Sequence, residues 1–323
     1  MKNVLLSGGL GFIGSNFIHY LMNNTDCKIM NIDKQTYAGN PDNIKEYENN
    51  DRLINIKADI NDIFDYEDEI VDFNPDVVVH MAAESHVDRS IDNPWPFIHS
   101  NIIGTFKLLE FCRKKINPKK MIIFETDEIY GSVKSGDSYE TDRLEPSSVY
   151  SASKASTGLL SRAYNVTYGL PVITVRPCNN YGQYQYPEKL IPLFITNLLE
   201  DKKVPVYGTG ENQREWLHVE DCCDAIWFLC NNGTIGRTYN IGTGCRVSNI
   251  EITKKILEIM NKGEDSIEYV EDRKGHDWRY AISSYHINKL GWYSKIDFED
   301  GLRKTIEWYR NNREWWVNLK NKL

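Results

Sequence analysis

A glycine-rich turn between a strand and a helix is the sequence feature that most constrains how this chain can fold. An apolar run at residues 3–7 leads into Gly8, Gly11 and Gly14 at three-residue spacing, and a helical pattern of apolar residues follows. Such glycines permit a tight turn, let the backbone approach a pyrophosphate and let the helix pack closely on the strand. Three glycines alone are a weak signal, because flexible loops often contain them. Their place between a strand and a helix favours a dinucleotide-binding unit.

An acidic residue at the end of the next strand indicates which dinucleotide the turn would bind. The strand at residues 28–32 is followed by Asp33, an acid about 20 residues past the glycines. A carboxylate at this position binds both ribose hydroxyls of NAD and repels the 2′-phosphate of NADP. We therefore expect NAD as the cofactor.

Strands and helices alternate through the first half of the chain. Further strands are expected at residues 52–60, 76–81, 122–125 and 171–176, and helices at residues 101–115 and from 148 to about 168. This alternation predicts an α/β fold with a doubly wound, Rossmann-like parallel sheet. We place an NAD-binding Rossmann domain at residues 1–178, with strand returns from about 204–245, and a smaller C-terminal α+β substrate lobe at residues 179–323.

The composition argues against several kinds of partner. The net charge of −8 disfavours nucleic acid, which requires a basic face. No apolar run approaches the ~20 residues of a membrane helix, and the apolar stretch at residues 4–6 is too short for a signal peptide. We therefore expect no membrane partner and a cytoplasmic location. The seven cysteines include no Cys-x-x-Cys pair, and the adjacent Cys222 and Cys223 lack neighbours at zinc-site spacing, so we expect free thiols and no metal.

The strand at residues 122–125 ends in a polar triplet, Thr126, Asp127 and Glu128. The carboxyl edge of an open parallel sheet is where ligands bind. Two adjacent acids at that edge could divide general-acid and general-base work if their surroundings separate their pKa values. The alternative, for an isolated pair, is a solvated acidic turn after a strand.

A tyrosine and a lysine lie four residues apart in the helix expected after residue 148. Tyr150 and Lys154 would share one face of that helix. A nearby ammonium group favours the phenolate and lowers the pKa of a tyrosine from its usual value near 10. Tyr-x-x-x-Lys occurs by chance in many helices, but its place downstream of an NAD-type glycine turn favours Tyr150 as a catalytic base.

With these motifs, the chain resembles the nucleoside-diphosphate-glucose 4,6-dehydratases, which belong to the extended short-chain dehydrogenase/reductase family and include the enzymes that use dTDP-glucose. The similar stretches are residues 8–16, 33–40, 82–91, 126–131, 150–154, 179–192 and 272–280, and the resemblance covers nearly the whole chain. The triplet at residues 126–128 is its most specific part, because sugar-nucleotide epimerases of the wider family lack the acid pair.

The resemblance implies a reaction and a role for each catalytic residue. A dTDP-glucose or UDP-glucose would lose water to give the 4-keto-6-deoxy sugar nucleotide, with NAD taking a hydride from C4 and returning it to C6. Tyr150, assisted by Lys154, would remove the proton of the 4-hydroxyl, and Thr126 would hydrogen-bond the same oxygen. Glu128 would remove the C5 proton, while protonated Asp127 would protonate the leaving 6-hydroxyl. The residues alone do not decide which adjacent acid takes which role.

The resemblance also implies two sets of binding residues. The expected cofactor set is Gly8, Gly11, Phe12, Ile13, Gly14, Asp33, Lys34, Thr36, Asp59, Ile60, Ala82, Ala83, Ser85, Ser100, Tyr150, Lys154 and Asn180. The expected substrate set is Ser85, His86, Thr126, Asn179, Lys189, Leu190, Pro205, Tyr207, Arg214, Asn249, Arg273 and His276. Lys189, Arg214 and Arg273 would surround the diphosphate and nucleoside, although either arginine by itself would be read as a surface ion-pair partner.

Several points stay open at this level. Gln183, Thr209 and the segment 176–178 depart from the usual pattern near the expected nucleoside end, so the choice between dTDP and UDP is undecided. A UDP-sugar 4-epimerase and a non-catalytic NAD-binding scaffold are the alternative functions. Residues 300–320 read as one terminal helix without a ligand role. The family commonly forms homodimers in which the helices near 101–115 and 151–168 pair into a four-helix bundle, and we expect a homodimer here.

Overall fold

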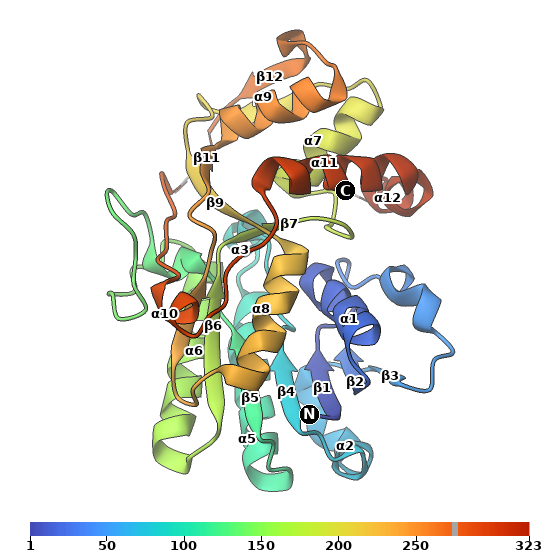
Figure 1. Ribbon diagram of the computed structural model, residues 1–323, viewed down its shortest axis with the longest axis vertical. Helices are drawn as coiled ribbons and strands as arrows, with labels where there is room; N and C mark the ends of the chain where they lie inside the picture. Colours follow the sequence, from blue (N-terminus) through green and yellow to red (C-terminus); the bar gives the residue numbers. More distant parts are fainter. Residues whose placement is uncertain (273–276, 323) are drawn as a thin grey trace.

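The centre of this computed structural model, which describes residues 1–272 and 277–322, is a parallel sheet of seven strands (Figure 1). The strands are β1 (Asn3–Ser7), β2 (Lys28–Asp33), β3 (Leu53–Lys57), β4 (Val77–His80), β5 (Lys120–Phe124), β6 (Val172–Pro177) and β10 (Thr238–Ile241). Their order across the sheet is β10-β6-β5-β4-β1-β2-β3. The order reverses beside β1, so the predicted doubly wound Rossmann-like sheet is confirmed.

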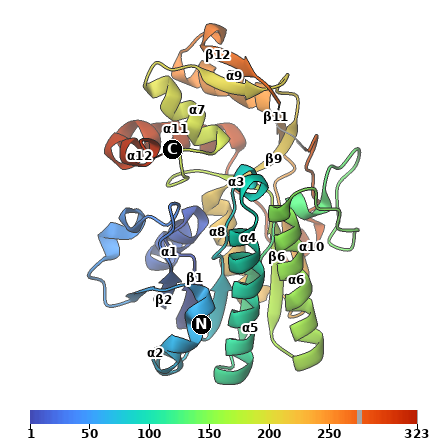
Figure 2. The same cartoon turned by 180° about the vertical axis from the view of Figure 1, so that it is seen from behind.

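Both faces of the sheet are buried, because successive side chains of a strand point to opposite faces. Val4 and Leu6 of β1 belong to an apolar cluster that includes α1 (Phe12–Asn24) and α8 (Val219–Asn232), whereas Leu5 belongs to a cluster with α5 (Gly104–Lys115). Figure 1 views the molecule from the side of α8, and Figure 2 views it from the side of α5 and α6.

The long helix α6 (Val149–Tyr168) carries Tyr150 and Lys154 and is confirmed within one residue of its expected start. Its first turn is closed by a capping box, in which Ser148 and Ser151 each accept a backbone N–H of the other. Its last residue precedes Gly169, whose φ of 72° belongs to the left-handed region that ends many helices. These caps fix both ends of the helix that presents Tyr150.

Two of the expected boundaries differ from the structure. The strand expected at residues 52–60 ends at Lys57, because Asp59 turns away and its side chain accepts the Asn61 backbone N–H at 3.0 Å. The helix expected at residues 101–115 is preceded by a π-helical segment, η3 (Ile98–Ile103), and α5 itself begins at Gly104. The remaining short elements of this half are η1 (Pro41–Tyr47), η2 (Ile60–Tyr66), α2 (Glu67–Phe73), α3 (Val87–Asp92), α4 (Trp95–Phe97) and η4 (Asp127–Tyr130).

The C-terminal lobe contains two small sheets and the helices that cover them. One sheet has the order β11-β9-β7, from β7 (Asn179–Tyr181), β9 (Gln213–His218) and β11 (Arg246–Ser248), and the other pairs β8 (Val204–Tyr207) with β12 (Ile267–Val270). The other elements are α7 (Leu190–Leu199), α9 (Asn249–Met260), η5 (Glu264–Ser266), α10 (Tyr285–Lys289), α11 (Phe298–Asn311) and α12 (Arg313–Lys320). β6 and β7 thus belong to different sheets, while the domain boundary between residues 178 and 179 stays a prediction.

The single terminal helix expected at residues 300–320 is wrong, because the chain breaks at Asn312 into α11 and α12. Asn312 has φ −116° and ψ 44°, outside the helical region. The break lets α12 fold back, so that the buried Trp316 indole N–H donates to the Tyr309 carbonyl at 2.8 Å. Continuing helical periodicity in the sequence concealed this turn.

Across the described ranges, no helix is both long and apolar enough to cross a membrane. Within those same residues, no cluster of three or more His, Cys, Asp or Glu side chains has an arrangement that could hold a metal ion. All seven cysteines are free thiols, and six of them are buried.

Candidate active site

A cavity of about 320 Å³ opens at the carboxyl ends of β1, β2, β4, β5 and β6, between the sheet and the C-terminal lobe. Every expected cofactor residue and every expected catalytic residue lines it, together with several of the expected substrate residues. The lining members of these sets are Gly8, Gly11, Phe12, Ile13, Gly14, Asp33, Lys34, Thr36, Asp59, Ile60, Ala82, Ala83, Ser85, Ser100, Thr126, Asp127, Glu128, Tyr150, Lys154, Asn179, Asn180 and Lys189. The structure therefore brings residues from distant parts of the chain to one place.

Other residues of the expected substrate set lie elsewhere. His86, Leu190, Pro205, Tyr207, Arg214 and Asn249 do not line the cavity. Arg273 and His276 lie outside the described residues. Arg214 is nevertheless close enough to Asp127 that its positive charge acts on the pKa of that carboxyl group. It is buried, stacks on the Tyr280 ring with its Cζ 4.2 Å from the ring centroid, and donates to the Asp277 carbonyl at 3.0 Å.

The glycine turn approaches the backbone that follows β4 too closely for any side chain. Gly8 has a φ of +80°, and a Cβ placed there would lie 2.6 Å from the backbone nitrogen of Ala82. A Cβ at Gly14 would collide with the Gly8 carbonyl oxygen. The turn therefore requires glycine for both the backbone conformation and the available space. It leaves the N-terminus of α1 open toward the cavity, where backbone N–H groups favour an anion.

Asp33 and its neighbours form the far end of the cavity. The Asp33 carboxylate accepts the backbone N–H groups of Leu10 at 3.0 Å and Gln35 at 2.8 Å. Burial raises the pKa of Asp33, and these two hydrogen bonds and the Lys34 charge act against that shift. Lys34 donates to Ser100 at 3.0 Å and lies 3.4 Å from Asp59. A carboxylate tied to the glycine turn in this way is well placed to accept hydroxyl groups.

The acid pair at the end of β5 is not a solvated turn, because Asp127 is only 2% exposed. Thr126 caps the short helix η4 by accepting the Glu128 backbone N–H at 3.4 Å, and its hydroxyl donates to Asp127 Oδ1 at 3.3 Å. Asp127 Oδ2 is buried without a hydrogen-bond partner. Burial, followed by the negative charges of Glu128 and Glu215, raises the pKa of Asp127 well above its usual value. Burial and these charges therefore favour the protonated form of Asp127, beside Glu128.

Tyr150 and Lys154 lie in the cavity wall on one face of α6, as their spacing predicts. The expected lowering of the Tyr150 pKa is wrong for the chain alone. Burial, and then the negative charge of Glu128, raises the Tyr150 pKa, although a hydrogen bond with Thr126 acts against this. Burial also lowers the pKa of Lys154 to about 8, because desolvation disfavours an ammonium group. Sequence spacing gives no measure of this burial.

Four carboxylates or cations that were not expected from the sequence lie near or in the cavity. Glu188 lines it, accepts the Tyr37 hydroxyl at 2.9 Å and lies 3.7 Å from His86 Nε2. The Arg89 guanidinium carbon is 3.5 Å from the centroid of the Tyr37 ring. Glu84 and Glu125 also line the cavity. The position of Glu125 was a signal that could have identified it, since it lies directly between the end of β5 and the triplet.

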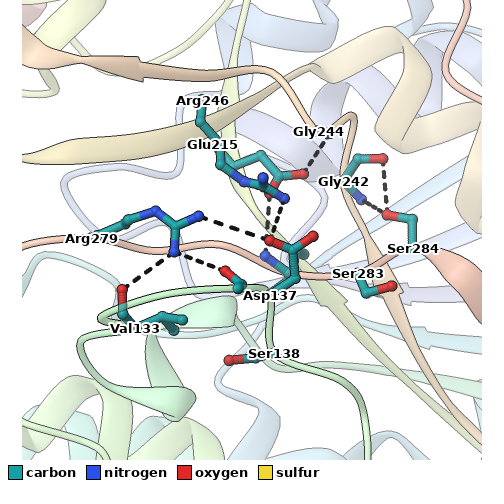
Figure 3. Close-up of polar contacts among 12 residues, drawn as sticks. Val133, Asp137, Ser138, Glu215, Gly242, Gly244, Arg246, Arg279, Ser283 and Ser284 are labelled. Carbon is teal, nitrogen blue, oxygen red and sulfur yellow. Dashed lines mark hydrogen bonds and ion pairs between the residues drawn. The ribbon is translucent and has the colours of Figure 1, made fainter.

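The loop between the triplet and α6 is fastened by charged residues of other segments (Figure 3). Asp137 of this loop lies 2.8 Å from Arg246, which also approaches the buried Glu215 at 3.5 Å. Arg279 donates to the loop carbonyls of Val133 at 3.3 Å and Gly136 at 2.8 Å. Glu215 in turn accepts the backbone N–H groups of Thr243 and Gly244. These contacts hold in place the loop that connects the triplet at residues 126–128 to Tyr150 and Lys154 on α6.

The fold and the site together define a class of protein. A doubly wound sheet, a glycine turn at its first strand and a Tyr-x-x-x-Lys pair in the same cavity are characteristic of the extended short-chain dehydrogenases/reductases. Residues 5–305 match the family model described as GDP-mannose 4,6 dehydratase, and the chain belongs to this family of nucleotide-sugar 4,6-dehydratases.

Similar proteins cover nearly the full chain. The low-salt glycan biosynthesis protein Agl12 of Haloferax volcanii is 45% identical over 97% of this chain and 100% of its own length. A dTDP-glucose 4,6-dehydratase of Neisseria meningitidis serogroup B is 43% identical over 99% of this chain and 97% of that protein. The crystal structure of DesIV, a dTDP-glucose 4,6-dehydratase from Streptomyces venezuelae with NAD and TYD bound, has a TM-score of 0.95, with 42% identity over 98% of this chain and 100% of the other.

Proposed function

We propose that the protein is an NAD-dependent dTDP-glucose 4,6-dehydratase, a hydro-lyase that converts its substrate to the 4-keto-6-deoxy sugar nucleotide. The observation that carries this proposal is the buried Asp127 beside Glu128, in the same cavity as Tyr150. A protonated acid next to a carboxylate supplies the acid and the base that removal of water requires. A 4-epimerase has no step that uses such a pair. The relatives named dTDP-glucose 4,6-dehydratase support the choice of nucleotide.

The chain's own residues suit NAD. Gly8, Gly11 and Gly14 bring the backbone of the turn to the wall of the cavity, where a pyrophosphate could approach it, and Asp33 presents a carboxylate for the ribose hydroxyls. The DesIV structure, with NAD bound, supports the same cofactor for this chain. NAD, when bound, supplies the reversible oxidation at the sugar carbon that makes elimination of water possible.

Each catalytic residue then has one task. Tyr150 takes the proton of the sugar's 4-hydroxyl, and Thr126 hydrogen-bonds that oxygen. Lys154, on the same face of α6, is the cation of the chain that favours the Tyr150 phenolate. Once C4 is a ketone, the C5 proton becomes acidic, and Glu128 removes it. Asp127, whose pKa is raised well above its usual value by burial, gives its proton to the departing 6-hydroxyl as water leaves.

The substrate's diphosphate requires cations near the lobe. Lys189 lines the cavity immediately before α7, and its ammonium donates to the Ser85 carbonyl at 3.3 Å. Arg214 lies behind the acid pair on β9. We assign both residues to the diphosphate and nucleoside, together with Asn179, His86 and Asn249. The roles of Arg273 and His276 remain predictions.

Direct turnover tests the proposal. Purified protein is incubated separately with dTDP-glucose, UDP-glucose and GDP-mannose, and the products are analysed by mass spectrometry. We expect dTDP-glucose to lose one water, and the product to show the alkaline absorbance of a 4-keto-6-deoxy sugar. A product of unchanged mass would identify an epimerase, and the absence of turnover with all three would contradict a catalytic role.

Asp33→Asn is expected to lower the affinity for NAD about tenfold, because a neutral amide replaces the charged acceptor of the ribose hydroxyls. The same change removes the repulsion of a 2′-phosphate, so the preference for NAD over NADP becomes smaller. Titration of each dinucleotide, followed by protein fluorescence, measures both effects. Asp26→Asn is the matched control, since Asp26 is exposed between α1 and β2. Unchanged NAD affinity in Asp33→Asn would contradict the assignment.

We also propose that two copies pair through α5 and α6. These helices lie side by side on one face of the molecule (Figure 2). Large apolar side chains on them are exposed, including Phe106 at 42%, Leu159 at 59% and Val166 at 71%. A second copy that covers these residues would remove this apolar surface from water.

Leu159→Asp is expected to convert the dimer to a monomer, because a carboxylate would be buried without a partner at the proposed interface. Light scattering coupled to size exclusion measures the mass directly. Ile235→Asp makes the same exchange at a 48% exposed position outside both helices and should leave the mass unchanged. A monomeric parent protein, or a Leu159→Asp variant that stays dimeric, would refute this interface.

A further inference from the structure

The strongest unassigned feature of the cavity is a buried carboxylate immediately before the catalytic triplet. Glu125 follows β5, is 3% exposed and lines the cavity. One of its oxygens, Oε2, accepts a hydrogen bond from Arg176 Nε at 2.5 Å. The other, Oε1, is buried without a hydrogen-bond partner. A buried carboxylate oxygen without a partner is costly, so its presence calls for a physical reason.

The location of that carboxylate is set by a glycine of α6. A Cβ built on Gly158 would collide with Glu125 Oε1, so the carboxylate occupies the space that a side chain at this position would fill. Gly158 lies four residues after Lys154, and residues at this spacing share one face of a helix. Because Cα–Cβ bonds tilt toward the helix N-terminus, the space beside Gly158 lies on the side of Lys154. Glu125 is thus inserted into the same stripe of α6 that carries Tyr150 and Lys154.

Among the described titratable groups around Lys154, Glu125 is the one whose negative charge acts on the Lys154 ammonium group. Burial lowers the Lys154 pKa to about 8, and the charge of Glu125 acts in the opposite direction. Burial raises the pKa of Glu125 itself, while the charge and hydrogen bond of Arg176 and the charge of Lys154 act against that rise and favour the carboxylate. His80 of β4 also lies near Lys154, but burial holds its pKa near 3, so it is neutral and bonds to Ser7 and Thr105. The Arg176 guanidinium of β6 donates hydrogen bonds to the Glu125 carboxylate and to the Tyr130 hydroxyl.

The acids of the triplet do not serve as the partner of Lys154. Burial raises the pKa of Asp127 well above its usual value, and the charge of Glu128 acts on the pKa values of Tyr150 and Asp127. Tyr150 itself, on the same face of α6, is neutral until its raised pKa is reached. Among the described residues, Glu125 is the carboxylate that acts on Lys154.

We propose that Glu125 is a positioning residue for the Tyr150–Lys154 pair. Arg176 holds its carboxylate by a hydrogen bond, and the absence of a side chain at Gly158 leaves a notch in the face of α6 that the carboxylate occupies. Its negative charge keeps the Lys154 ammonium group protonated. The ammonium group in turn favours the Tyr150 phenolate. The inference rests on the proposed function for the task of Tyr150, but the charge state of Lys154 is measurable without any turnover.

The test follows the titration of Lys154 directly. Protein labelled at lysine Nζ is titrated by NMR, and the Lys154 signal is identified by its loss in Lys154→Met. The midpoint in the parent is expected near 8. Glu125→Gln should lower this midpoint by about one pH unit, which is the smaller end of the shift caused by a nearby opposite charge. The alkaline limb of the pH profile of kcat/KM should move in the same direction.

Two further variants separate charge from structure. Glu140→Gln neutralises another buried carboxylate near Arg176, whose Nη1 donates to the Glu140 carbonyl at 3.1 Å, and should leave the Lys154 midpoint unchanged. Gly158→Ala keeps the Glu125 charge but pushes it out of the notch, so the midpoint should fall by less than in Glu125→Gln. This variant decides the matter if Glu125→Gln does not fold.

The outcomes are distinct from those of the activity assay. An unchanged Lys154 midpoint in both Glu125→Gln and Gly158→Ala would overturn the proposal, even if turnover fell at every pH, since Glu125 would then serve only to neutralise Arg176. A shifted midpoint in a protein that dehydrates no sugar nucleotide would support the Glu125–Lys154 interaction and refute the proposed function instead.

Discussion

Tyr150→Phe is expected to lower kcat about 10³-fold, because removal of a general base typically costs two to four orders of magnitude. The hydroxyl is the only group lost, and the ring retains its edge-on packing against Phe97, at 6.3 Å between ring centroids. Binding of the dinucleotide should therefore change little. The first oxidation of the sugar should fail, so mixing enzyme with dTDP-glucose should produce no absorbance of reduced nicotinamide.

A second tyrosine of α6 provides the matched control. The Tyr164 hydroxyl donates to Glu110 at 2.8 Å, away from the cavity. Tyr164→Phe removes the same atom from the same helix and should leave kcat within about twofold, since it costs only a hydrogen bond of about 1 kcal/mol in stability. Equal losses in both variants would mean that Tyr150 supports the fold and is not the base.

Glu128→Gln is expected to separate the two halves of the reaction. Tyr150 and Thr126 remain, so the sugar's C4 should still be oxidised in a first turnover. Without the carboxylate, the C5 proton should stay in place, and overall turnover should fall by about 10²–10³-fold. Reduced nicotinamide should accumulate on the enzyme, which rapid-mixing absorbance measures, and the sugar should retain its water by mass.

The control for this variant is an exposed acid of the same loop. Glu145 is 59% exposed, and Glu145→Gln should behave as the parent. If Glu128→Gln turns over like the parent, the base of the elimination is another group. If it shows neither turnover nor reduced nicotinamide, Glu128 acts before the elimination, and the division of labour within the acid pair is wrong.

The sheet and the cofactor end of the cavity could be predicted from sequence because their signals are local. A glycine turn, an acid at the end of the second strand and alternating strands and helices follow from short-range spacing. The Tyr150–Lys154 pair is likewise a property of one helix. The raised pKa of Asp127 could not be predicted in this way, since burial and the charges of Glu215 and Arg214, more than 80 residues away in the chain, set it.

The errors have the same origin. The direction of the Tyr150 pKa shift depends on burial beneath other segments, and spacing along α6 does not encode it. The break at Asn312 brings Trp316 to the Tyr309 carbonyl, a contact seven residues apart within a stretch whose periodicity is helical. The strand β8 pairs with β12, about 60 residues later, so its neighbours could not be inferred from its own residues. Glu125 was not identified from the sequence because its proposed role depends on contacts with Arg176 and Gly158, which the sequence does not show.

The contacts that hold the loop after the triplet affect the order in which the site can form during synthesis of the chain. Arg279 donates to the carbonyl of Val133 across a separation of 146 residues, and the Ser138 carbonyl accepts the backbone N–H of Ser283. During synthesis, the parallel strands from β1 to β6 leave the ribosome long before these residues. The contacts that hold the loop between the acid pair and Tyr150 can therefore form only after residues 279–283 have been made, well after the strands that carry the cofactor end of the cavity.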